Sequence, residues 1–86
     1  MTEEKKTTLD VIKIRRNLNN KYPIGYIPRQ EIREATGGIL IPKTMSNRDT
    51  EDEGISGAVK ISGKICYPID NVINYLEEKT KILDVA

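Results

Sequence analysis

The sequence of 86 residues contains no histidine, no tryptophan and no phenylalanine, and Cys66 is its only cysteine. The absence of histidine excludes catalytic schemes with an imidazole base, and a single cysteine cannot form an internal disulfide or a Cys/His zinc site. Acidic residues could act as a catalytic pair only if folding brought two of them into one cleft, and no motif indicates such a pair. We therefore expect no enzymatic activity, no metal and no cofactor.

Long apolar runs are also absent, since no stretch approaches the roughly 18 residues that a membrane-spanning helix requires. Residues 1–8 are polar and charged, so they lack the apolar middle region of a secretory signal. A chain of this length can bury one small core. These features predict one cytoplasmic domain with no membrane partner.

Charge is nearly balanced over the whole chain, with a net value of +1. Residues 1–22 and 58–69 are nevertheless basic, whereas residues 51–57 and 70–86 are acidic. A net charge near zero argues against a purely electrostatic coat for nucleic acid, but the basic segments could still form one face after folding.

An amphipathic segment at residues 9–18 spaces its apolar side chains as a helix does, although a strand remains an alternative. We expect the asparagines that follow to end this element: Asn17, Asn19 and Asn20. Its apolar side is predicted to dock on the same domain or on a second copy of the chain. In either case Arg15 and Arg16 should stay exposed.

The chain is accordingly divided into three parts. We expect residues 1–22 to form an N-terminal extension that is mobile at 1–8 and helical at 9–18. Residues 23–81 form the folded domain, and residues 82–86 form a tail.

The middle of the chain predicts two short helices. Residues 21–28 contain two prolines and a glycine, which favours an extended connection, and residues 29–36 favour a helix. Gly37 and Gly38 should end that helix, because glycine readily adopts the left-handed backbone conformation. Pro42 then begins a second helix that runs to about Asp49, with Met45 facing inward. Two short helices joined by such a turn are typical of a helix-turn-helix.

Residues 58–67 predict a β-hairpin. We favour a three-residue loop at Ser62–Lys64 over a two-residue loop, because it sets Ile61 opposite Ile65 and Val59 opposite Tyr67. All four would share one face, with Lys60 and Cys66 on the other. A closing helix is predicted at 69–81, with Asp70 near its N-cap and these residues inward: Val72, Ile73 and Leu76. We expect Cys66 to be a small buried or edge residue, and Tyr67 and Tyr75 to belong to the core.

Three stretches of the sequence resemble one protein family. The runs IPRQEIREATGGIL, PKTMSN and GISGAVKISGKICYPIDNVINYL are together similar to the excisionase-type and MerR-like small winged helix-turn-helix proteins of bacteria and phages. The resemblance covers about residues 26–79. It implies an α+β winged helix-turn-helix fold, with two short helices, a β-hairpin wing and a closing helix. It also implies sequence-specific binding of double-stranded DNA, by an excisionase-like architectural factor or a transcriptional regulator of a phage or mobile element.

By the same resemblance, residues 42–47 would be the recognition helix, and Lys60 and Lys64 would be wing contacts. The full set of candidate DNA-binding residues is Arg29, Lys43, Thr44, Ser46, Asn47, Arg48, Lys60 and Lys64. Side chains of these types hydrogen-bond phosphates or base edges, although a merely solvated helix face is the alternative. The acidic residues 51–53 should turn away from a duplex.

Other partners are compatible with the same fold. Another DNA-bound protein or a second copy of the chain could join the complex on DNA. The alternative function is a protein-interaction module that binds a partner through residues 9–18 and the second helix. Retention on DNA that weakens steeply with salt would distinguish the two functions.

Overall fold

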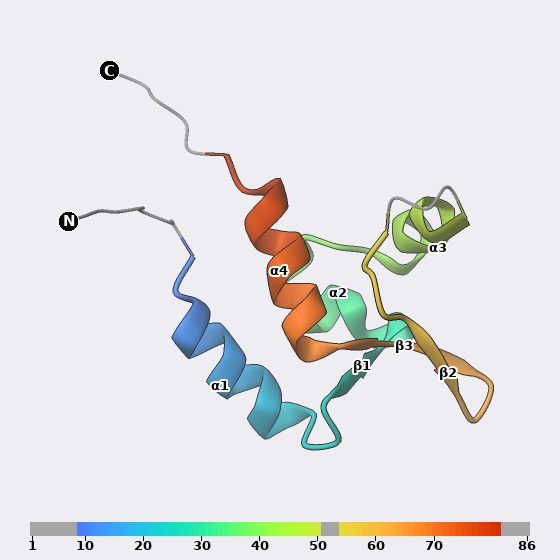
Figure 1. The fold of residues 1–86 in the computed structure, drawn as a ribbon, viewed down its shortest axis with the longest axis horizontal. Helices are drawn as coiled ribbons and strands as arrows, with labels where there is room; N and C mark the ends of the chain where they lie inside the picture. The colour runs from blue at the N-terminus through green and yellow to red at the C-terminus, as the bar shows by residue number, and fades with distance from the viewer. Residues whose placement is uncertain (1–8, 51–53, 82–86) are drawn as a thin grey trace.

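The computed structural model describes residues 9–50 and 54–81, without the side chains of Asp49 and Thr50. Within these ranges the chain forms an α+β fold with four α-helices and one three-stranded antiparallel sheet (Figure 1). The elements in chain order are α1 (Val11–Lys21), β1 (Tyr26–Pro28), the 3-10 helix η1 (Arg29–Glu31), α2 (Ile32–Ala35), α3 (Pro42–Thr50), β2 (Val59–Ile61), β3 (Lys64–Pro68) and α4 (Ile69–Lys79).

Helix α1 confirms the helical prediction for the amphipathic segment and rules out the strand alternative. Asp10 caps it, because its side-chain oxygen accepts a hydrogen bond of 3.0 Å from the backbone N–H of Lys13. The prediction that three asparagines end the helix is wrong, since it continues to Lys21. Leu18 and Tyr22 are both buried in the core, so tertiary packing holds the last turn despite the low helix propensity of asparagine.

Packing of α1 on α4 confirms that the segment docks on its own chain. Leu18 belongs to the core, while Val11 and Ile14 pack against it. Arg15 is half-buried and forms an ion pair of 3.1 Å with Asp70 of α4, which corrects the expectation that Arg15 stays exposed. Arg16 is exposed as predicted. The expected mobility of residues 1–8 concerns a segment outside the described residues.

The sheet has the strand order β1-β3-β2. Strand β1 lies within residues 21–28, for which the sequence predicts only an extended connection; Tyr26 pairs with Pro68 and Ile27 with Tyr67. A proline is tolerated in β1 because this strand is at the edge of the sheet. Pairing with β3 therefore makes a regular strand from a segment whose composition favours a connection.

The hairpin register differs from the predicted one. Val59 pairs with Cys66, Lys60 with Ile65 and Ile61 with Lys64, so the loop is the two-residue turn Ser62–Gly63. Both turn residues have positive φ, +53° at Ser62 and +83° at Gly63, as a type I′ turn requires. A type I′ turn matches the right-handed twist of the two strands. This match outweighs the apolar pattern, which favoured a three-residue loop.

Helix α2 and helix α3 follow the order predicted for the middle of the chain, although the first begins as the 3-10 helix η1. Gly37 and Gly38 end α2 with φ of +66° and +88°. Thr36 fixes the turn that follows, because its hydroxyl donates to the Ile32 carbonyl at 2.7 Å and accepts from the Leu40 N–H at 3.0 Å. The direction in which the chain enters α3 is therefore set locally.

The core draws side chains from every α-helix and from strands β1 and β3. Its members are Leu18, Tyr22, Ile27, Ile32, Met45, Ile55, Tyr67, Ile69, Val72, Ile73 and Tyr75. The predicted burial of Tyr67, Tyr75 and Cys66 is confirmed, and Leu76 packs against the core from α4. No helix in the described ranges is both long and apolar enough to span a membrane.

We expect the turn at Ser62 to respond in opposite directions to two substitutions. Ser62→Asn should raise the free energy of unfolding by about 0.5 kcal/mol, because asparagine tolerates positive φ, and Ser62→Val should lower it by about 1 kcal/mol. Chemical denaturation measures both values. Equal effects of the two variants would contradict the type I′ turn.

Candidate nucleic-acid interface

Helix α3 presents polar side chains on the face opposite its core contact. Met45 is completely buried. Lys43 and Asn47, two residues before and after it, are both exposed. Because they are four residues apart, they lie on the same face of the helix, one turn from each other. The structure therefore bears out the outward orientation predicted for this pair.

The other candidate residues of α3 lie at the sides of the helix. Thr44, Ser46 and Arg48 are each half-buried. Arg48 is three residues from Met45 and thus lies nearer the core side, so part of its aliphatic stem is covered. These residues flank the face formed by Lys43 and Asn47 without sharing its full exposure.

The two hairpin lysines are exposed but do not share a face. Lys60 is paired with Ile65, and Lys64 with Ile61. Cross-strand partners lie on the same side of a sheet and successive residues alternate, so Lys60 lies on the side of Tyr67 and Lys64 on the side of Cys66. The prediction that Lys60 and Cys66 share a face is wrong, because the loop is one residue shorter than expected.

Arg29 begins η1 and is held by the middle strand. Its Nε donates a hydrogen bond of 2.9 Å to the hydroxyl of Tyr67, and its guanidinium carbon lies 6.0 Å from the centre of the Tyr67 ring. Tyr67 has no exposed surface, so it is a rigid support. This contact joins residues 38 positions apart, and no sequence motif indicates it.

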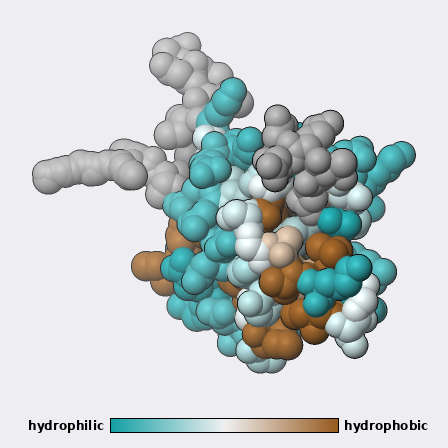
Figure 2. Space-filling view, turned by 45° about the vertical axis from the view of Figure 1, so that its right-hand side comes forward, coloured by the Kyte–Doolittle hydropathy of each residue, from teal (hydrophilic) through white to brown (hydrophobic). Residues whose placement is uncertain are grey.

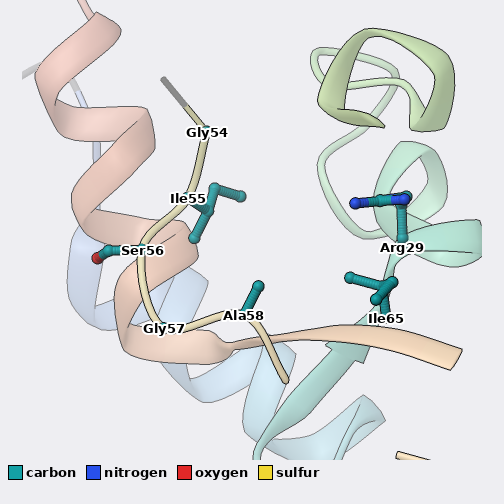
Figure 3. A pocket seen from close by; sticks show the side chains of 7 residues that line it. All are labelled: Arg29, Gly54, Ile55, Ser56, Gly57, Ala58 and Ile65. Atoms are coloured by element: carbon teal, nitrogen blue, oxygen red, sulfur yellow. The ribbon is translucent and has the colours of Figure 1, made fainter. Parts of the chain in front are cut away.

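The Arg29 side chain extends into a hollow of about 400 Å³, as Figure 3 shows. The hollow lies between η1, the chain from Gly54 to Ala58, and Ile65 of β3. Ile55 faces Arg29 across it and is itself buried against the core. The hollow is therefore bounded by the start of η1 and by residues 54–58, which lead into β2.

The approach to the hairpin is fixed by α4. The Asn71 side-chain amide donates a hydrogen bond of 2.7 Å to the Ser56 carbonyl. Gly57 has φ of +79°, and a Cβ at this position would collide with the Asn71 amide nitrogen. Glycine is therefore required here on two counts, its positive φ and the close approach of the Asn71 side chain.

Described cations occur at both ends of the molecule. Among the side chains that the structure describes, those of α3, β2 and β3 include cations but no acids. Helix α1 likewise carries cations and no acids, and two of its cations form ion pairs with neighbouring helices: Arg15 with Asp70 of α4, and Lys21 with Glu34 of α2 at 3.7 Å. The residues 51–53, which are expected to turn away from DNA, lie outside the described ranges.

Tyr22, outside this surface, has a raised pKa. Burial raises the pKa of Tyr22 to about 12, and the carboxylates of Glu31 and Glu34 act in the same direction. Tyr22 lies directly after α1, away from α3 and the hairpin. Within the described part of the chain, no group of three His, Cys, Asp or Glu residues is placed to hold a metal ion.

Helix α3 and the hairpin occupy the same end of the long axis of the molecule, and α1 occupies the other end (Figure 1). In Figure 2 this end shows apolar surface mixed with hydrophilic side chains. Ile61, next to the hairpin turn, is 37% exposed. The surface thus combines exposed cations, an exposed amide and apolar groups on two projecting elements.

Comparisons with protein-family models, with curated proteins and with solved structures found no match for this chain. No relative therefore indicates what this surface binds.

The packing of α3 should be sensitive to charge at one position. Met45→Asp should lower the free energy of unfolding by more than about 3 kcal/mol, because it buries a carboxylate without a partner. Met45→Leu is the matched control and should cost less than about 1.5 kcal/mol, since the volume is retained. Chemical denaturation measures the free energy of unfolding of both variants. Equal losses of stability would show that Met45 does not anchor α3.

Proposed function

We propose that this protein is a small winged helix-turn-helix that binds double-stranded DNA sequence-specifically. Helix α2, the Gly37–Gly38 turn and helix α3 form the helix-turn-helix, and the β2–β3 hairpin is the wing. The resemblance noted from the sequence and the arrangement of α3 and the hairpin at one end of the molecule support the same proposal.

The observation that carries the proposal is the outward face of α3. Lys43 and Asn47 project together from a short helix whose opposite side is anchored by Met45. An α-helix fits the major groove of B-DNA, where asparagine can bond adenine in two places and lysine can bond guanine or phosphate. The polar and basic residues of α3 therefore form the base-reading surface in this proposal.

The hairpin supplies the second contact. Because Lys60 and Lys64 lie on opposite faces, a hairpin that enters the minor groove edge-on can direct one lysine to each phosphate strand. Ile61 lies between them in sequence and is partly exposed, so it would face the sugars. This arrangement differs from a wing that lies flat on one strand, which would use a single face.

Arg29 has a positioning role in the same complex. Tyr67 holds its Nε, and the guanidinium edge faces the hollow beside the hairpin approach. A phosphate that enters this hollow would accept hydrogen bonds from a side chain whose orientation is already fixed. Contacts to phosphate of this kind set the register of the protein on the duplex and carry no sequence information.

In the cell, such a protein would be a cytoplasmic, non-enzymatic DNA-binding factor of a phage or mobile element. It would act either as an excisionase-like architectural factor or as a transcriptional regulator. A second copy or another DNA-bound protein would join it on adjacent sites.

The alternative is a protein-interaction module that binds a partner through residues 9–18 and the second helix, and residues 9–18 offer it little apolar surface. Leu18, Val11 and Ile14 already pack against the core, so most of the apolar side of that segment is used within the chain. Ile12 is 73% exposed, but a single exposed isoleucine is a small contact for a stable protein partner.

The decisive experiment uses the full chain to select, from a pool of random duplexes, the sequences that it binds. Enrichment of a common sequence supports the proposal. Retention of all duplexes alike, or of none, would contradict sequence-specific binding and favour the alternative function.

Substitutions in α3 should weaken binding to the selected duplex without loss of stability. If these side chains contact bases, Asn47→Ala and Lys43→Ala should each reduce the difference in binding free energy between the selected and a scrambled duplex by about 1 to 3 kcal/mol, the usual value of a base contact. Unfolding free energies should change by less than about 0.5 kcal/mol, since both side chains are exposed. Titration of selected and scrambled duplexes measures the discrimination.

Asn19→Ala and Lys13→Ala on α1 are the matched controls, because both residues are exposed at the other end of the molecule. They should leave binding unchanged. If the α3 and α1 variants bind equally well, α3 is not the recognition helix.

The wing lysines should act through salt-dependent contacts. Lys60→Gln and Lys64→Gln should each reduce the slope of log affinity against log salt by about 0.9, because each lysine would neutralise one phosphate. Lys13→Gln is the control and should leave the slope unchanged. A reduced slope for only one variant would mean that the hairpin lies flat on one strand, and no reduction for either would remove the hairpin from the interface.

A further inference from the structure

The β2–β3 hairpin is attached to the rest of the domain at two points. At its exit, Pro68 of β3 is followed directly by Ile69, the first residue of α4. At its entry, residues 56–58 are exposed and belong to no helix or strand. The direction in which the hairpin projects therefore depends on what holds these two points.

The exit is held by strand pairing and by burial. Strand β3 pairs with β1, and the core contains three residues from the first two turns of α4: Ile69, Val72 and Ile73. The N–H of Ile69 also donates a hydrogen bond of 3.0 Å to the Gly25 carbonyl. The start of α4 is thus a rigid base for the hairpin.

The entry is bound to that base by one side chain. Asn71, in the first turn of α4, donates a hydrogen bond of 2.7 Å from its Nδ2 to the Ser56 carbonyl, and the same nitrogen lies 3.4 Å from the Ser56 hydroxyl. In Figure 3 the Ser56 side chain lies on the α4 side of the segment, whereas Ile55 points toward the hollow. The contact joins the two attachment points directly.

Gly57 allows the entry to lie this close to α4. Besides the collision with the Asn71 amide, a Cβ at this position would lie 3.3 Å from Cγ of Pro68. The backbone at Gly57 therefore lies against both the first turn of α4 and the last residue of β3. Asn71 thus closes the base of the hairpin.

We propose that Asn71 is a positioning residue that fixes the direction in which the hairpin projects from the domain. Ile55 anchors the same segment by burial in the core. Burial of an apolar side chain resists separation but is not directional, whereas a hydrogen bond to a backbone carbonyl is directional. Asn71 therefore restrains a rotation of the hairpin that Ile55 permits.

The consequence for DNA rests on the proposed function. Lys60 and Lys64 can reach phosphates while α3 lies in the major groove only if the hairpin keeps its direction relative to α3. A hairpin that swings would have to be ordered on binding, and this ordering costs free energy. Loss of the Asn71 amide should thus weaken the contacts of the hairpin and leave those of α3 intact.

The free protein tests the positioning role without DNA. Residual dipolar couplings of backbone amides report the orientation of the hairpin relative to the helices. We expect Asn71→Ala to reduce the couplings of Lys60 and Lys64 relative to those of α4, because the hairpin then samples several directions. Asn74→Ala is the matched control, since Asn74 is an exposed asparagine one turn further along α4, and it should leave the couplings unchanged. Unchanged couplings in Asn71→Ala, or an equal reduction in both variants, overturn the proposal.

Asn71→Asp separates the hydrogen bond from the stability of the helix. Aspartate keeps the shape of the side chain but, when ionised, cannot donate, and an acid in the first turn favours the helix. We expect the hairpin couplings to fall as in Asn71→Ala, with a smaller fall in the denaturation midpoint. A general structural role would make the couplings and the midpoint change together. Wild-type couplings in Asn71→Asp also overturn the proposal, because the donated hydrogen bond would then not hold the hairpin.

A second experiment uses the duplex that the full chain selects. In Asn71→Ala the slope of log affinity against log salt should fall by up to about 1.8, the value expected if two lysine–phosphate contacts are lost. Lys60→Gln should then reduce the slope little further, since its contact is already lost. Lys43→Ala should weaken binding by the same factor with and without Asn71, because α3 keeps its contacts.

These outcomes distinguish a failure of this proposal from a failure of the proposed function. If the wild-type protein selects no duplex, or if its slope does not depend on Lys60, the couplings in the free protein alone decide the role of Asn71. If the wild-type protein binds and Lys60→Gln reduces the slope equally with and without Asn71, the proposal is overturned.

Discussion

Strand β3 lies between β1 and β2, and its residue Tyr67 has no exposed surface. Tyr67 pairs with Ile27 of β1, its ring fills the core, and its hydroxyl holds Arg29. The same strand carries one side of the hairpin and continues directly into α4. The placement of the hairpin, of η1 and of α4 thus depends on one buried tyrosine and the strand that bears it.

The turn between α2 and α3 is the second constraint. Two glycines with positive φ end α2, the Thr36 hydroxyl bonds on both sides of the turn, and Met45 fixes the rotation of α3 about its axis. Because this rotation is fixed, Lys43 and Asn47 must point outward together. The described side chains of α3 and the hairpin include cations and no acids, and on α1 two of the cations, Arg15 and Lys21, form ion pairs.

Much of the local structure could be predicted from residue patterns. Helical spacing identified α1, the burial of Met45 and the inward residues of α4, and the glycine pair located the end of α2. The candidate site was predictable where it depended on a helix face, as for Lys43 and Asn47. The hairpin part of the candidate site was not predictable. A loop that is one residue shorter moves every side chain of β2, including that of Lys60, to the opposite face of the hairpin relative to β3.

The sequence by itself determined the positions of the helices, because apolar spacing, proline and glycine act over a few residues. Only the tertiary structure decided the rest. Strand β1 exists because β3 supplies its hydrogen-bond partners, α1 extends through its asparagines because Leu18 and Tyr22 are buried, and Arg29 is oriented because Tyr67 lies beside it. Each of these features depends on groups far apart along the chain, and their proximity is a property of the folded protein that no local pattern contains.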